Sequence, residues 1–389
     1  MEVSEKLSSR AISVEHSPLY AVMDWAKGLP GVLHLNIGEP DFKTPEHIIE
    51  GAKQALDLGF IHYSSDIGNI RLKELIAEEI KREMGVDFDP ESEILITAGA
   101  QAGLYVAILS LVNPGDKVIV FSPYYPPYVV DIKFAGGVPV FVPVREEKGF
   151  IPGPEETESK VTAKTKLMII NSPNNPTGAV DSEKCLEDLA EIAKRHNLLV
   201  ISDEAYRKLT YDGLKHHSIV SLPGMKERTI VIHTFSKTYA MAGWRIGYLA
   251  TNREFITQML KMHHLINICV NTIAQNAAIT ALAGPQDCVR EFAEEYDRRR
   301  KFMVKALNEI QGFKCRMPEG AFYVFPNTKE LGLSSMELTK RLVVEARVIT
   351  APGSGFGIEG EGYLRISYAQ PMEVLEEAVE RIQKTVEKF

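Results

Sequence analysis

Lys237 is the residue with the clearest capacity for covalent chemistry. It lies in TIVIHTFSKTYAMAGWRIG, residues 229–247, where an apolar run predicts a buried strand and Arg245 follows eight positions after the lysine. A buried ammonium is costly unless its charge is paired or its pKa falls, and an amine that is unprotonated part of the time can form a Schiff base. Taken alone, such a lysine is more often salt-bridged at a domain edge, so other residues have to decide between the two interpretations.

Three other segments place polar groups at the ends of predicted strands. LLVISDEAY puts Asp203 just past a strand and Tyr206 three residues later, although an N-cap aspartate beside a packed tyrosine would give the same pattern. NSPNNPTG, residues 171–178, holds Asn175 in a turn that two prolines and a glycine fix. TAGAQAG, residues 97–103, either lets backbone N–H groups approach an anion at a helix N-terminus or forms a close-packed corner.

Together the four segments meet the requirements of one cofactor. Pyridoxal 5'-phosphate needs a lysine for its aldehyde, a carboxylate for its ring nitrogen, donors for its 3-oxygen and an anion site for its phosphate. Each of these groups is present near the end of a predicted strand. The convergence outweighs the structural alternatives for the single segments, and it predicts a pyridoxal-phosphate site without a metal.

The elements that must position these residues alternate between short apolar strands and amphipathic helices. This order predicts an α/β fold with a mostly parallel sheet, whose ligand crevice lies at the carboxyl ends of the strands. After residue 285 the pattern changes to a long charged helix over 291–310 and a smaller α+β unit. We expect an N-terminal segment (1–45) packing on the small domain and the active site, a large cofactor-binding domain (46–285) and a small C-terminal domain (286–389). The predicted strands are 94–97, 117–121, 138–142, 167–170, 198–202, 229–233 and 246–251.

The composition excludes several other classes of protein. The 389 residues are 45% hydrophobic and 25% charged, as in an ordinary globular protein. With 44 Lys and Arg against 52 Asp and Glu, the net charge of −8 argues against a nucleic-acid partner. Four widely spaced cysteines contain no CxxC pair, and the sequence shows neither a signal-peptide core nor an apolar run long enough for a membrane helix. We therefore expect a cytoplasmic protein without a membrane partner.

The motifs resemble those of one family along nearly the whole chain. LNIGEPDF, HYSSDIGNIRLKELIA, NSPNNPTG, SDEAY, SKTYAMAGWRIG and RISYA stand in the order found in fold-type I pyridoxal-phosphate aminotransferases of class I/II, the aspartate/aromatic type. The resemblance implies that Lys237 is the Schiff-base lysine and proton shuttle, and that Asp203 pairs with the pyridine nitrogen. Asn175 and Tyr206 correspond to the donors to the 3-oxygen. Tyr125 corresponds to the ring stacked on the cofactor, where tryptophan is more common.

The same resemblance implies the remaining contacts to the phosphate and the substrate. Arg365 and Gly38 correspond to the residues that hold the substrate α-carboxylate, beside Asn175, and Tyr63 to a tyrosine that reaches the phosphate from a neighbouring subunit of a homodimer. The phosphate ligands within the chain are expected to be Ala100 and Gln101 through the backbone, with Thr234, Ser236 and Arg245.

The implied reaction is ping-pong transfer of an amino group from an amino acid to a 2-oxo acid, with 2-oxoglutarate as the expected acceptor. A lyase, racemase or synthase would use the same motifs, and a non-catalytic ligand sensor is a third hypothesis. Gln101 stands where some relatives have a lysine for the distal carboxylate of aspartate, and Tyr20, Tyr124 and Tyr128 near the expected entrance favour an aromatic or broad substrate range. Aromatic, aspartate and broad specificity all stay open.

Three patterns are interpreted as structural. The glycines of GFGIEG, residues 355–360, precede a predicted strand rather than a helix, so we expect a mobile loop instead of a dinucleotide site. The histidine pairs at 216–217 and 263–264 consist of adjacent residues that diverge, so surface or packing roles are expected. The run Arg298, Arg299 and Arg300 is expected on a solvated, charge-paired helix face.

Overall fold

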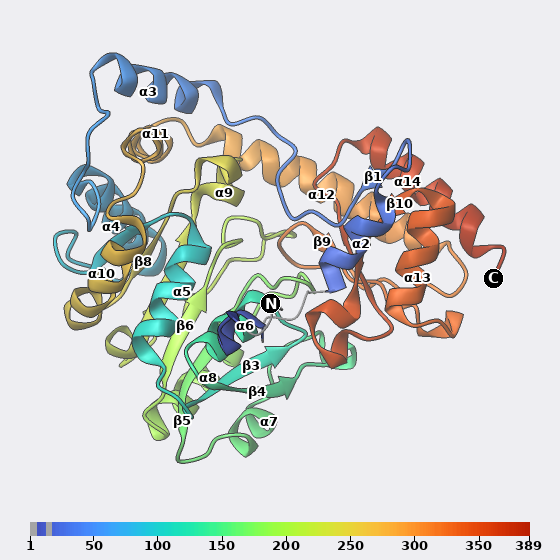
Figure 1. Ribbon diagram of the computed structural model, residues 1–389, viewed down its shortest axis with the longest axis horizontal. Helices are drawn as coiled ribbons and strands as arrows, with labels where there is room; N and C mark the ends of the chain where they lie inside the picture. Colours follow the sequence, from blue (N-terminus) through green and yellow to red (C-terminus); the bar gives the residue numbers. More distant parts are fainter. Residues whose placement is uncertain (1–5, 13–17) are drawn as a thin grey trace.

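The computed structural model describes residues 6–12 and 18–389, without the side chains of residues 9, 10, 19 and 20. Figure 1 shows a central sheet with helices on both faces and a second group of elements, formed mainly by the C-terminal part of the chain, against its edge. The sheet has seven strands in the order β2-β8-β7-β6-β5-β3-β4, and only β8 is antiparallel to its neighbours. The strands are β2 (Ile94–Thr97), β3 (Lys117–Ser122), β4 (Val138–Pro143), β5 (Thr165–Asn171), β6 (Leu199–Asp203), β7 (Thr229–Thr234) and β8 (Gly247–Ala250).

All seven predicted strands form, within two residues of their expected bounds, and the predicted α/β class is confirmed. Their continuous apolar runs follow from burial on both faces. In β5, Leu167 and Ile169 pack among residues of α5, α6 and α10, whereas Met168 and Ile170 point to the opposite face, among residues of α8. The helices around the sheet are α3 (Glu46–Asp57), α4 (Ile70–Met84), α5 (Ala100–Leu111), α6 (Pro127–Phe134), α7 (Pro154–Ser159), α8 (Glu183–Arg195), α9 (Phe235–Thr238), α10 (Arg253–Asn267) and α11 (Thr272–Ala283).

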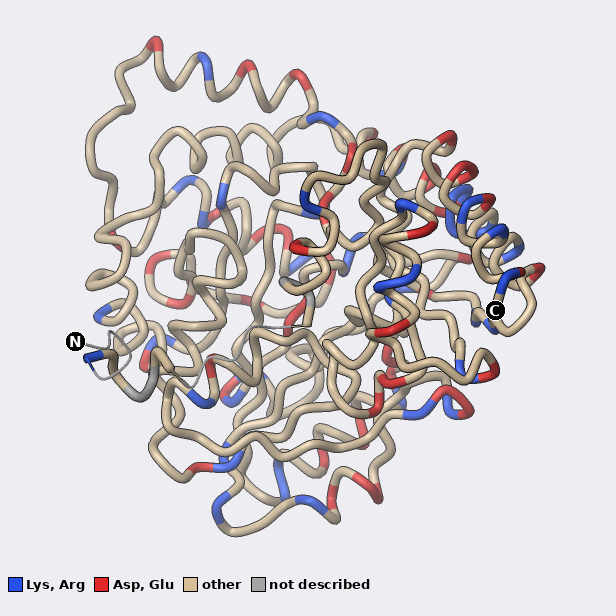
Figure 2. The backbone as a smooth tube through the Cα atoms, turned by 45° about the vertical axis from the view of Figure 1, so that its right-hand side comes forward, with Lys and Arg blue, Asp and Glu red and all other residues tan. Residues whose placement is uncertain are grey.

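The C-terminal elements have an apolar core of their own, to which Leu35 and Tyr206 also contribute. The expected boundary at 285/286 falls between α11 and α12, and the division into domains stays a prediction. The elements are α12 (Asp287–Asn308), β9 (Tyr323–Val324), α13 (Ser335–Arg341), β10 (Val348–Ile349), β11 (Ala351–Pro352), β12 (Leu364–Ser367) and α14 (Met372–Val386). Figure 2 shows charges of both signs along the outer C-terminal helices, and Arg381 pairs with Glu377 one turn away on α14.

The N-terminal part reaches this C-terminal core. It contains α1 (Ser9–Ile12), α2 (Pro18–Ala26) and β1 (Leu33–His34). Strand β1 pairs in parallel with β10, so the chain that follows, residues 35–38, is brought to the edge between the two groups of elements. Strands β11, β12 and β9 form a separate three-stranded antiparallel sheet.

The arginine run on α12 differs from the prediction. Arg298 is exposed and bonded to Glu295, but Arg299 and Arg300 are buried, with carboxylate partners in Asp41 and Asp212 respectively. Consecutive helical residues lie about 100° apart, so three in a row cannot share one solvated face. The expectation of a wholly solvated run is therefore wrong.

The other patterns set aside as structural have packing environments. The GFGIEG run forms short 3-10 turns in which Gly355 and Gly360 are buried, and its mobility stays a prediction. His263 is fully buried on α10. Within the described ranges, no group of three or more His, Cys, Asp or Glu side chains could hold a metal ion. No helix among the described residues is both long and apolar enough to cross a membrane.

Candidate active site

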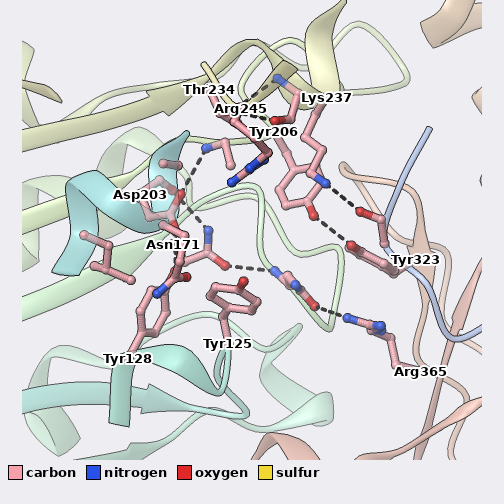
Figure 3. Close-up of a pocket in the computed structure, with 17 residues that line it drawn as sticks. Tyr125, Tyr128, Asn171, Asp203, Tyr206, Thr234, Lys237, Arg245, Tyr323 and Arg365 are labelled. Atoms are coloured by element: carbon pink, nitrogen blue, oxygen red, sulfur yellow. Dashed lines mark hydrogen bonds between the residues drawn. The ribbon is translucent and has the colours of Figure 1, made fainter. Parts of the chain in front are cut away.

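A cavity of about 320 Å³ lies at the C-terminal edge of the central sheet and is closed on its other side by residues of the N-terminal segment and of β9 and β12. Figure 3 shows the side chains converging on it from both groups of elements. All but one of the sequence-predicted site residues line this cavity, and Tyr63 does not. The predicted residues that line the cavity are Gly38, Ala100, Gln101, Tyr125, Asn175, Asp203, Tyr206, Thr234, Ser236, Lys237, Arg245 and Arg365.

Lys237 reaches the cavity from the short helix α9, which follows β7 directly. The hydroxyl of Thr234 caps this helix by accepting a hydrogen bond from the backbone N–H of Ser236 at 3.1 Å. The Nζ of Lys237 donates to the carbonyl oxygen of Gly38 at 2.5 Å. Burial lowers the pKa of Lys237 to about 8, the positive charges of Arg245 and Arg365 lower it too, and nearby carboxylates oppose the change. The amine is thus partly neutral at physiological pH.

Asp203 is the last residue of β6, so its carboxylate lies where the strand meets the cavity. Burial raises the pKa of this carboxyl group above its ordinary value. Two hydrogen bonds oppose the effect, because the Tyr128 hydroxyl donates to Oδ2 at 2.6 Å and the Ala205 N–H donates to Oδ1 at 3.1 Å. The bond from the Ala205 N–H is the local N-cap that the structural interpretation of this motif predicts. The same carboxylate also lines the cavity, so the two interpretations of Asp203 are compatible.

The turn that contains Asn175 is hydrogen-bonded to the ends of β5 and β6. The Asn171 side chain accepts from the Asn175 N–H at 2.9 Å and donates to the carbonyl of Asp203 at 3.1 Å. Across the cavity, Arg365 Nη1 donates to Asn175 Oδ1 at 3.0 Å, and Tyr206 and Tyr323 share a hydrogen bond of 2.7 Å between their hydroxyls. Both residues predicted to contact the 3-oxygen are therefore linked to side chains of the C-terminal core.

The N-terminus of α5 lies at the cavity beside Thr234, Ser236 and Arg245. Gly99 precedes the helix with φ +82°, and a Cβ at this position would lie 2.5 Å from Arg245 Nη2, so only glycine fits. The first N–H groups of α5, the hydroxyls of Thr234 and Ser236 and the guanidinium of Arg245 face one space, an arrangement suited to a phosphate. The side chain of Gln101 turns away to donate to Asp131 at 3.1 Å, which leaves its backbone N–H at the helix start.

Arg365 has donors left for a ligand. Two of its nitrogens donate to Asn175 and to the carbonyl of Asn36, whereas the buried Nε has no hydrogen-bond partner among the described residues. A guanidinium has five N–H donors, so part of the fork is free to bind a carboxylate. Its carbon lies 4.5 Å from the ring centre of Tyr323, which fixes its plane. The unpartnered Nε of Arg365 suits a substrate carboxylate, and the space beside Gly99 and Arg245 suits a cofactor phosphate. The residues present therefore fit both anionic groups.

The remaining aromatic residues lie in different places. Tyr125 lines the cavity edge-on to Tyr128, with ring centres 5.5 Å apart. Tyr128 is buried and donates to Asp203 within the cavity, so the expectation that it lies near the entrance is wrong. Tyr124 stacks on Phe141. The side chain of Tyr20 lies outside the described residues. Tyr63 is 81% exposed and outside the cavity of its own chain.

Sequence reasoning missed Asn171 and Tyr323, and it misplaced Tyr128. Asn171 stood inside the NSPNNPTG motif, and its position at a strand end was the available signal. The sequence predicts Tyr128 near the entrance because it does not show the direction of the side chain, which depends on how SPYYPPY turns into α6. Tyr323 comes from GAFYVFP, more than a hundred residues after Tyr206, and nothing in the spacing connects the two.

A mostly parallel sheet with a lysine and a carboxylate at its C-terminal edge, closed by an arginine from a second core, is the arrangement of the fold-type I aminotransferases. The profile of the family described as aminotransferase class I and II matches residues 30–382. The chain belongs to this family, whose members use pyridoxal phosphate, and it is a transaminase.

Individual relatives agree with this assignment. An aromatic-amino-acid aminotransferase 2 from Thermococcus litoralis is 44% identical over 384 residues, covering 98% of each chain. An aspartate aminotransferase from Pyrococcus abyssi is 44% identical over 382 residues, again 98% of each chain. A solved structure, the aromatic aminotransferase from Pyrococcus horikoshii OT3, has a TM-score of 0.90 at 44% identity and covers 94% of this chain and 99% of that one.

The hydrogen bond to Asp203 gives a first prediction. Tyr128→Phe removes a donor that stabilises the charged carboxylate, so the pKa of Asp203 rises further. The affinity of the apoprotein for pyridoxal phosphate should fall by roughly tenfold near neutral pH, the scale of one bond to a charged group, and recover as the pH rises. Spectroscopic titration measures this, with Tyr105→Phe on α5 as a control outside the cavity. Equal affinity of both variants at every pH would contradict the assignment.

Proposed function

We propose that this transaminase moves the amino group of an amino acid to 2-oxoglutarate by a ping-pong mechanism, with pyridoxal 5'-phosphate as cofactor. The observation that supports it is the position of the Lys237 amine, inside a cavity between the anion site at α5 and the guanidinium of Arg365. One end suits a phosphate and the other a carboxylate. An amino acid joined to the cofactor presents these two anions at opposite ends.

The residues that would hold the cofactor follow from the donors present. The α5 N-terminus and Arg245 would bind the phosphate, together with the hydroxyls of Thr234 and Ser236, and Asp203 would pair with the ring nitrogen. The Asn175 amide and the Tyr206 hydroxyl would donate to the 3-oxygen, and Tyr125 would cover the ring. When bound, pyridoxal phosphate supplies an aldehyde that bonds to amines and a ring that accepts the electron pair left when the substrate Cα loses its proton.

The chain itself provides binding, orientation and proton transfer. Arg365 and the backbone at Gly38 hold the substrate carboxylate and so direct the Cα–H toward Lys237. With a pKa of about 8, the Nζ of Lys237 takes a proton from the substrate Cα and holds it as an ammonium; it would then donate this proton to the aldehyde carbon of the cofactor.

The cavity favours a neutral substrate side chain, although the proposal covers aromatic, aspartate and broad ranges. Relatives bear both the aromatic and the aspartate name. The cations that line the cavity in the described part of the chain are Lys237, Arg245 and Arg365, and each already has a role. Gln101 is bonded to Asp131 and offers no positive charge to a distal carboxylate. A second carboxylate would need a cation from elsewhere, such as a partner subunit.

A homodimer with shared active sites is part of the proposal. Tyr63 is 81% exposed, and Phe60 and Ile61 beside it are exposed by 45% and 66%. Contiguous exposed apolar side chains of this kind are typical of protein interfaces. In a symmetric dimer this segment would reach the phosphate site of the neighbouring subunit. A cytoplasmic location is also proposed, because all four cysteines are free thiols, as a reducing compartment would keep them.

Nitrogen balance tests the proposed reaction. The purified protein with pyridoxal phosphate, tyrosine or aspartate and 2-oxoglutarate should form one glutamate for each 2-oxo acid released from the donor. Without 2-oxoglutarate, turnover should stop after one equivalent per active site, because the amino group stays on the cofactor. Continued release of ammonia without an acceptor would favour a lyase, and racemisation alone a racemase. A protein that forms no product and still binds amino acids would favour the ligand sensor.

Arg365 gives a prediction about substrate binding. Arg365→Lys keeps the charge but loses the planar fork, and Arg365→Ala loses both, so KM should rise for every amino-acid substrate and more for the alanine variant. For Arg365→Ala, the decrease in kcat/KM should correspond to a loss of about 2–5 kcal/mol in transition-state stabilisation, the scale of truncating a buried charged partner. Arg298→Ala, an exposed arginine of α12 bonded to Glu295, is the control. A KM unchanged across substrates would remove Arg365 from the carboxylate site.

A further inference from the structure

Tyr323 is a cavity residue to which the family motifs assigned no role. It is 1% exposed, it lies on β9, and its hydroxyl is 2.7 Å from the hydroxyl of Tyr206. The ring is held from two sides. The guanidinium of Arg365 covers one face, and a Cβ at Gly38 would lie only 2.0 Å from the Tyr323 oxygen, so the hydroxyl fits closely against that glycine.

The two hydroxyls have only two protons to share. Burial raises the pKa of both phenols above the ordinary value, so both stay protonated at physiological pH. Each hydroxyl donates one hydrogen bond and can accept more. Because one proton lies between the two oxygens, the direction of that bond decides whether Tyr206 has its own proton available for a third group.

We infer that Tyr323 is a positioning residue that acts through Tyr206: its hydroxyl donates to the Tyr206 oxygen and leaves the Tyr206 proton for the 3-oxygen of the cofactor. The inference rests on the proposed function, since it needs a 3-oxygen beside Tyr206. Without Tyr323 the Tyr206 hydroxyl loses its fixed acceptor role, and it can turn away from the cofactor. A chain of two hydroxyls is also a stronger donor at its end than a single one.

The placement of Tyr323 also links the two ends of the site. Ser367 on β12 pairs with Tyr323 on β9, so Arg365, two residues earlier on β12, belongs to the same small sheet. This sheet bonds to the cavity wall twice, through Arg365 to Asn175 and through Tyr323 to Tyr206. The element that holds the substrate carboxylate thus also orients both donors to the 3-oxygen.

The experiment is a double-variant cycle read from the bound cofactor. Four proteins are loaded with pyridoxal phosphate: wild type, Tyr206→Phe, Tyr323→Phe and the double variant. Without substrate, the absorption of the bound cofactor is measured against pH, and the midpoint of its titration is compared among the four. A donor to the 3-oxygen stabilises its anion, so its loss raises the midpoint. Tyr206→Phe should raise it by roughly one pH unit, the scale of one bond to a charged group, and Tyr323→Phe by less. The double variant should match Tyr206→Phe alone, because Tyr323 then has no residue to act through.

Two controls separate this role from simple packing. Tyr368→Phe removes another buried hydroxyl of the C-terminal core, bonded to the Ala321 carbonyl at 3.1 Å and outside the cavity, and it should leave the midpoint unchanged. If Tyr323→Phe does not fold, 3-fluorotyrosine at position 323 keeps the ring and strengthens the donor, so the midpoint should fall instead of rise.

The outcomes distinguish this inference from the function on which it rests. A wild-type protein that takes up no pyridoxal phosphate overturns the proposed function and the inference together. A wild type with a titrating band, shifted by Tyr206→Phe but not by either change at position 323, overturns the inference alone. Additive shifts in the double variant also overturn it, because they would show that Tyr323 acts independently of Tyr206.

Discussion

An amine that must lose its charge inside the protein constrains the rest of the structure. Lys237 lies in a cavity with two guanidinium groups, and burial with this repulsion brings its pKa down to about 8. At pH 7 roughly one molecule in ten then has a neutral amine, against fewer than one in a thousand for an exposed lysine. Such a site needs a scaffold that cannot relax, and the C-terminal ends of buried parallel strands provide one. Asp203 and Lys237 stand at or just beyond the ends of adjacent strands, β6 and β7.

The site forms only where three distant parts of the chain meet. The sheet edge supplies Lys237 and the N-terminus of α5, residues 35–38 supply the backbone at Gly38, and the small sheet of β9 and β12 supplies Tyr323 and Arg365. The hydrogen bonds that close the cavity join groups far apart in sequence, 199 positions for Lys237 to Gly38 and 190 for Arg365 to Asn175. Because these bonds connect separate cores, the positions of Lys237, Asn175 and Arg365 around the cavity are set together.

Local sequence predicted the fold and most of the cavity, because both depend on features that are local. Apolar runs mark buried strands, and motif residues directly after such runs necessarily gather at one sheet edge. Side-chain direction is not local. The hydroxyl of Tyr128 reaches Asp203 only because α6 packs on the sheet. Tyr323 reaches Tyr206 only because the two cores join. Arg300 is buried on α12, where its guanidinium pairs with Asp212, a residue 88 positions earlier in the chain.

The most direct measurement is covalent fixation of the cofactor. The purified protein is incubated with pyridoxal 5'-phosphate above and below pH 8, treated with borohydride, digested and analysed by mass spectrometry. We predict a single pyridoxyl-phosphate adduct on Lys237, formed faster above pH 8 because the neutral amine reacts, and a near-ultraviolet to visible band that borohydride removes. An adduct spread over surface lysines, with Lys237 unmodified, would contradict the central claim that this buried amine is the reactive group.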